Sequence, residues 1–166
     1  MPLKIALHFH GGFAEQETDG AEARLLLSRI PGLTLIDMAG TERLGRHCSD
    51  AAIKGFGESQ YPGAMEAWIA EARRRGATHV ATLYHSCHRQ LLLTRRNMAA
   101  ENQLPVVNYL TLMARSLGLR ERDDRFAELA SRDSIETMLA EVDPNVRTLG
   151  VKPDQAQRAL RAQFQR

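Results

Sequence analysis

Two cysteines and six histidines are the residues of this chain best able to carry metal or redox chemistry. Both cysteines and five of the histidines fall in three short segments, at residues 8–12, at His47-Cys48 and at residues 84–88. Two thiolates and two imidazoles suit a zinc ion, or a [2Fe–2S] cluster with mixed ligands. Neither cysteine belongs to a C-x-x-C motif, so the spacing also fits two small core residues.

Cys87 falls where a predicted strand meets a predicted helix. A helix N-terminus presents backbone N–H groups and the positive end of the helix dipole, which favour a thiolate. A thiolate can bind a metal or attack a disulfide. Cys87 could also act as a nucleophile activated by a histidine base. His85 and His88 do not face Cys87 on a helix, however. The base would then come from another loop, as His10 or His47.

Apolar runs that alternate with helical patterns must position these segments. The predicted strands are 4–8, 33–37, 78–83 and 104–108, and the helical patterns between and after them cover 19–30 (with Asp19 as N-cap), 62–75, 84–101 and 110–117. This alternation predicts an α/β fold, a mostly parallel sheet with helices on both faces. Loops at the carboxyl ends of such strands carry the chemistry, so the three segments are expected to meet at one edge.

A helical C-terminal tail follows the predicted sheet. Helices are expected at 122–131, 133–142 and 153–164, with breaks at Asp143-Pro144 and Lys152-Pro153. We predict one α/β domain over residues 1–145 and a C-terminal helix over residues 146–166. A terminal amphipathic helix more often covers its own core than a partner, and we expect the same of this one.

Composition and charge exclude several classes of protein. The chain has 166 residues, 43% hydrophobic and 25% charged, which excludes collagen-like, low-complexity and disulfide-scaffold proteins. Its 22 basic and 20 acidic residues nearly balance, so no nucleic-acid partner is expected. The run Arg73–Arg75 reads as a solvated helix end. No apolar stretch approaches the roughly 20 residues of a membrane span. Without a visible targeting segment, a cytoplasmic location with reduced thiols is expected.

Motifs along the chain follow the order of a known repeat. They read Leu7-His8-Phe9-His10-Gly11-Gly12, Arg29-Ile30-Pro31-Gly32-Leu33, His47-Cys48, Gly55-Phe56-Gly57, Arg75-Gly76-Ala77-Thr78-His79-Val80, Tyr84-His85-Ser86-Cys87 and Val106-Val107-Asn108. In these motifs the chain resembles the C-terminal cysteine-rich (CCG) repeat of the cysteine-rich subunit of heterodisulfide reductase and of related glycolate and lactate oxidase iron–sulfur subunits. The spacers from Gly11 to His47 and from Cys48 to Tyr84 each hold 35 residues, in agreement with that family.

The resemblance implies where a cluster would lie and which ligands have changed. In the family, five cysteines per repeat bind an iron–sulfur cluster. Cys48 and Cys87 stand at matching positions, whereas Gly11, His47 and Tyr84 replace the other three. Glycine offers no ligating side chain and tyrosine is a hard oxygen ligand, so the family's fused non-cubane cluster is not expected here.

The leading hypothesis is a redox or electron-transfer subunit of a heterodisulfide-reductase-like iron–sulfur complex. An atypical cluster would be held by the thiolates and nearby imidazoles, namely Cys48, Cys87, His47, His10 and His85, with the two cysteines also the catalytic candidates. The alternatives are a cluster-free structural or docking subunit, a thiol–disulfide site, and a mononuclear zinc site at the two cysteines. Expected partners are other subunits of a redox complex, a second CCG-repeat chain or a second copy of this chain.

Overall fold

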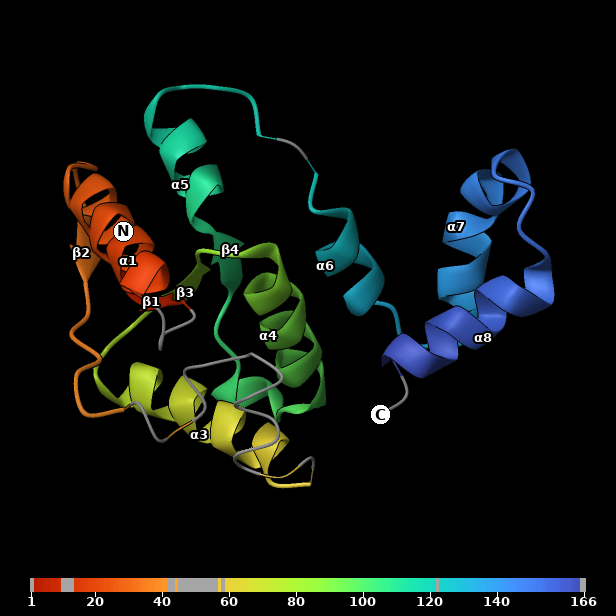
Figure 1. Cartoon of the computed structure of the whole chain (residues 1–166), viewed down its shortest axis with the longest axis horizontal. Helices are drawn as coiled ribbons and strands as arrows, with labels where there is room; N and C mark the ends of the chain where they lie inside the picture. The colour runs from red at the N-terminus through yellow and green to blue at the C-terminus, as the bar shows by residue number, and fades with distance from the viewer. Residues whose placement is uncertain are drawn as a thin grey trace. The chain divides into compact units, whose positions relative to one another are not determined.

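Four short parallel strands form the sheet of this protein, in the order β2-β1-β3-β4 (Figure 1). A computed structural model describes residues 2–9, 14–41, 44, 57, 59–121 and 123–164. The chain divides into two compact units, Met1–Arg122 and Asp123–Arg166. The sheet and its flanking helices confirm the predicted α/β class.

The elements of the first unit alternate as the sequence predicts. They are β1 (Leu3–His8), α1 (Ala14–Ser28), β2 (Leu33–Leu35), α3 (Tyr61–Arg74), β3 (His79–Thr82), α4 (His85–Asn97), the short 3₁₀ helix η1 (Ala100–Asn102), β4 (Val106–Asn108) and α5 (Tyr109–Ser116). None of the helices in the described part of the chain is both long enough and apolar enough to cross a membrane.

Apolar side chains cover both faces of the sheet. Ile5 and Leu7 of β1 belong to a buried cluster with Leu27 of α1 and Leu112 of α5. The intervening Ala6 belongs to a second buried cluster, built with α3 and α4. Successive side chains of a strand point to opposite faces, so α1 and α5 cover one face while α3 and α4 cover the other (Figure 1).

The chain order creates a switch point between β1 and β3. These neighbouring strands pair in parallel, with His8 opposite Thr82 at their carboxyl ends. From β1 the chain passes to α1 on one face, whereas from β3 it passes to α4 on the other. Parallel α/β sheets bind ligands outside the carboxyl ends of the strands at such a reversal.

The start of α1 differs from the prediction. The helix begins at Ala14, so Asp19 lies inside it and is not its N-cap. Glu15 and Glu17 occupy the first turn, where carboxylates complement the helix dipole. The carboxylate of Asp19 instead accepts a hydrogen bond from the hydroxyl of Tyr84 at 2.6 Å.

The second unit is helical, as predicted, but one predicted break is wrong. It holds α6 (Arg125–Ala130), α7 (Ile135–Thr148) and α8 (Pro153–Phe164). Pro144 removes one backbone donor, yet α7 continues through it. Burial of Ile135, Met138 and Val146 along α7 offsets that loss. The domain boundary predicted at residue 145 falls inside this helix.

Helix α8 has the bounds that the sequence predicts, residues 153–164. Its Ala156 and Phe164 are buried, and the Phe164 ring stacks on Phe126 of α6 at 5.4 Å between centroids. Its hydrophobic side therefore packs within its own unit, as expected of a terminal amphipathic helix.

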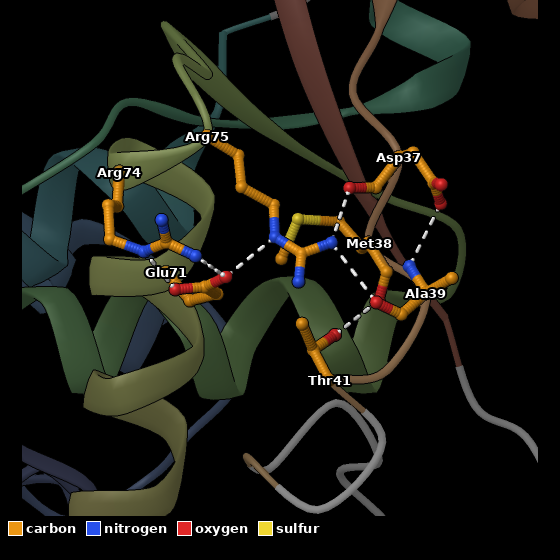
Figure 2. A network of polar contacts seen from close by, with 7 residues as sticks. All are labelled: Asp37, Met38, Ala39, Thr41, Glu71, Arg74 and Arg75. Carbon is orange, nitrogen blue, oxygen red and sulfur yellow. Dashed lines mark hydrogen bonds and ion pairs between the residues drawn. The ribbon is translucent and has the colours of Figure 1, made fainter.

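The arginine run at the end of α3 is anchored to the rest of the first unit, as Figure 2 shows. Glu71 accepts hydrogen bonds from Nε of Arg74 at 2.7 Å and Nε of Arg75 at 2.6 Å. Arg75 also donates to the carbonyl oxygens of Asp37 at 2.8 Å and Ala39 at 3.1 Å. The sequence predicts that these arginines are solvated. That holds for the side chain of Arg74, which is 72% exposed, but not for that of Arg75, which is 27% exposed. Arg75 ties the end of α3 to the segment after β2.

Acid should weaken this network, and Glu71→Gln tests it. Hydrogen bonds from Arg74 and then Arg75 lower the pKa of Glu71 from 4.5 to about 2. A carboxyl group with a depressed pKa stabilises the fold above its ordinary value and loses that contribution as pH falls through the depressed one. We therefore expect the free energy of unfolding to fall between pH 4.5 and about 2 more steeply in the wild type than in Glu71→Gln. Urea denaturation at several pH values measures it. Glu66→Gln, on the same helix, should keep the wild-type slope; equal slopes for Glu71→Gln and the wild type would contradict the argument.

Gly20 of α1 lies against the buried ring of Phe9, and alanine should not fit there. A Cβ at Gly20 would lie 2.7 Å from Cε2 of Phe9. We expect Gly20→Ala to destabilise the fold by about 1–3 kcal/mol, because the ring must move within a packed core. The matched control is Gly63→Ala in α3, where a Cβ meets nothing within 4 Å. Helix propensity should make that variant neutral or up to ~1 kcal/mol more stable. Thermal unfolding of both variants decides the matter, and a Gly20→Ala protein as stable as Gly63→Ala would refute it.

Candidate functional site

The switch point at the carboxyl edge of the sheet holds buried polar residues. His8 ends β1 and Thr82 ends β3, and both are fully buried. Alternation along the two strands turns both side chains toward α3 and α4. Burying a polar group without a hydrogen-bond partner costs free energy. The partners of His8 and Thr82 are therefore the first property of this edge to establish.

Thr82 is satisfied by its neighbours. Its hydroxyl lies 3.0 Å from Nδ1 of His88, on the first turns of α4. It also donates to the carbonyl oxygen of Val107 in β4 at 3.3 Å. A hydroxyl has a single proton, so when Val107 takes it, Thr82 accepts from Nδ1–H of His88. The pair fixes the His88 ring and joins β3, β4 and α4.

His8 has no such arrangement. Its side chain is 0% exposed, and neither ring nitrogen has a hydrogen-bond partner among the described residues. The ring meets Trp68 of α3 edge to face, with 5.0 Å between centroids. Nε1 of Trp68 is likewise buried and has no hydrogen-bond partner in the described structure. Each unsatisfied buried group costs about 1–3 kcal/mol. The unsatisfied groups of His8 and Trp68 therefore lie next to each other in the core.

Cys87 and His85 share the first turn of α4 but not an environment. Cys87 is 0% exposed, whereas His85 is exposed. Residues two apart on a helix point in different directions, which explains the difference. One of these two predicted ligands is therefore buried and the other faces solvent. The buried neighbour of Cys87 in sequence is His88, whose ring Thr82 holds.

Tyr84 stands immediately before α4 and links this edge to α1. Its hydroxyl donates to the Asp19 carboxylate at 2.6 Å. Burial, then this hydrogen bond and the charge of Asp19, raise the pKa of Tyr84 above its usual value, and Cys87 contributes in the same direction. The phenol therefore stays protonated and acts here as a hydrogen-bond donor.

Three predicted ligands, His10, His47 and Cys48, lie outside the described residues. Their assignment stays a prediction, and so does that of Cys87 and His85. The predicted set omits the polar residues that the structure places at the switch point, namely His8 of β1, Trp68 of α3, Thr82 of β3 and His88 of α4. One signal could have found the first of them. A histidine in an apolar strand covered by helices on both faces must be buried.

The donor set fits a metal or cluster in part. Thiolate and imidazole are the ligands that zinc and mixed-ligand iron–sulfur clusters take. Cys87 lies at the carboxyl edge of the sheet, where a ligand site is expected. Across residues 2–9, 14–41, 44, 57, 59–121 and 123–164, however, no group of three or more His, Cys, Asp or Glu could hold a metal ion. Such a group would have to draw ligands from the remaining residues, among them His47 and Cys48.

Comparison with known proteins adds no relative. The chain matches no family model, no curated protein and no solved structure. The arguments about function therefore depend on the site and on the motifs of the sequence.

The Thr82–His88 pair can be tested by removing only the hydroxyl. Thr82→Val keeps the shape of the side chain but removes the hydroxyl that contacts Nδ1 of buried His88. We expect a loss of about 1–3 kcal/mol in the free energy of unfolding. Thr82→Ser, which keeps the hydroxyl, should lose less. Urea denaturation compares the three proteins, and a Thr82→Val variant as stable as the wild type would show that the hydrogen bond contributes nothing.

Proposed function

We propose that this chain is a redox or electron-transfer subunit of a heterodisulfide-reductase-like iron–sulfur complex. The observation that carries the proposal is the position of Cys87. It is buried in the first turn of α4, at the carboxyl edge of a parallel sheet. Helix N-termini favour thiolates, and this edge is where α/β sheets hold their ligands.

The proposed site uses both cysteines and neighbouring imidazoles. Cys48 and Cys87 would supply thiolates, and His47, His10 and His85 are the candidate imidazoles. A bound iron–sulfur cluster would supply one-electron chemistry. Replacing thiolate by imidazole removes negative charge and raises the reduction potential, as in clusters with two histidine ligands. Of the two described members of this set, Cys87 is buried and His85 is exposed. His85 would lie on the side from which an electron partner approaches.

The proposed setting is a cytoplasmic complex. Reduced thiols are the normal state there, and they leave both cysteines able to bind a cluster. The expected partners are other redox subunits, a second CCG-repeat chain or a second copy of this chain, since the chain resembles one repeat where the reductase subunit has two.

A cluster-free subunit is the second candidate, and the same cysteine favours it. Cys87 lies one helical turn before Leu91, and both side chains are 0% exposed. A fully buried cysteine in such a place can serve as a small hydrophobic residue. In that case the domain would act in docking or structure, and Cys48 and Cys87 would bind no iron.

Metal and sulfide analysis separates the candidates. We expect protein purified without oxygen, or reconstituted with iron and sulfide, to be brown and to contain both elements. Cys87→Ala should lower the bound iron, because it removes one thiolate ligand, while far-UV circular dichroism shows a retained fold. Ser86→Ala, at the exposed neighbouring position, is the matched control and should keep the iron.

The other outcomes are equally specific. Colourless protein without iron after reconstitution would refute the redox proposal and favour the cluster-free subunit. Zinc without sulfide would indicate a mononuclear site instead. A two-hydrogen mass difference between oxidised and reduced protein, again without iron, would indicate a thiol–disulfide pair.

A further inference from the structure

His8 and Trp68 form a buried pair whose hydrogen-bonding capacity is unused within the described chain. Both side chains are 0% exposed and they touch, with 5.0 Å between ring centroids. Three polar atoms, Nδ1 and Nε2 of His8 and Nε1 of Trp68, have no hydrogen-bond partner among the described residues. Buried polar groups in folded proteins are nearly always paired, with protein, water or ligand. The unpaired groups lie on two touching residues from separate elements, β1 and α3, so one partner can serve both.

The place of the pair agrees with a ligand site. His8 is the last residue of β1 and lies opposite Thr82, the last residue of β3. The connections leave these two strands toward opposite faces, which is the reversal at which α/β sheets bind ligands. Thr82 and His88 are already hydrogen-bonded to each other on the same face. Thr82 therefore has its partners, whereas His8 and Trp68 have no hydrogen-bond partner in the described chain.

The chemistry of the two side chains selects the ligand class. An indole N–H only donates, and an imidazole donates from one nitrogen when neutral and from both when protonated. Trp68 has no lone pair to offer a cation, so a partner common to both residues must accept a hydrogen bond from its indole N–H. An anion gains most from that bond, because charge-assisted hydrogen bonds are the stronger ones.

From this geometry we infer that His8 and Trp68 bind a small oxyanion, a carboxylate or phosphate group, at the switch point between β1 and β3. The inference goes beyond the proposed redox function. It uses neither cysteine, and it would stand if the protein bound no cluster.

The single tryptophan of the chain makes the test direct. The protein has one indole N–H resonance in a ¹⁵N–¹H spectrum, and it belongs to Trp68. Inorganic phosphate and acetate, each replacing chloride at constant ionic strength, should shift this resonance to saturation. Comparing the two anions shows which oxyanion class the site prefers.

Variants identify the residues that bind. His8→Phe keeps an aromatic ring but removes both nitrogens, and it should weaken binding by at least about tenfold, the loss of one hydrogen bond to a charged ligand. His79→Gln, at a partly buried histidine elsewhere in the sheet, is the control and should bind as the wild type does. Trp68→Phe should weaken binding as well, measured by calorimetry because the reporter is lost.

Three results would overturn the inference. One is a resonance that does not shift, or shifts without saturating. Another is equal affinity in His8→Phe and the wild type. The third is a crystal structure, grown with phosphate, in which an ordered water or a protein group alone bridges His8 and Trp68. A folded His8→Phe protein is required for the comparison. If that variant fails to fold, Trp68→Phe and the wild-type titration still decide the outcome.

Discussion

Burial of β1 on both faces is the constraint on which this structure depends. The strand pairs with β2 on one side and β3 on the other, so its backbone donors and acceptors are used within the sheet. Its side chains divide between two apolar clusters, with Ile5 and Leu7 on one face and Ala6 on the other. From Ile5 to His8, where the strand is buried, every residue must suit a dry interior or find a partner there.

His8 shows what this constraint does at the end of the strand. The alternation that sends Ala6 toward α3 and α4 sends His8 the same way, into contact with Trp68. Thr82, its neighbour on β3, resolves the same problem by hydrogen bonding to His88. Within the described chain, two polar residues side by side in the sheet thus have opposite outcomes, one satisfied and one not. This contrast directs attention to the edge between β1 and β3 as the candidate functional region of the fold.

The order of the elements could be predicted from the sequence because it follows from local pattern. Short apolar runs separated by helical periodicity specify the strands and helices, and glycine or proline marks most of their ends. Where the prediction failed, tertiary contacts or burial accompany the difference. Asp19 pairs with Tyr84, and Arg75 reaches the carbonyl oxygens of Asp37 and Ala39. Pro144 is tolerated because α7 buries Ile135, Met138 and Val146.

The candidate site divides in the same way. The sequence by itself determined an α/β fold and predicted a gathering of cysteine and histidine segments after the strands, because residue type and periodicity are local properties. Only the tertiary structure decided that Cys87 is buried while His85 is exposed, and that Thr82 satisfies His88. It also decided that His8 and Trp68 meet without hydrogen-bond partners in the described chain. Burial and pairing depend on which elements pack together, and no pattern within one element contains that information.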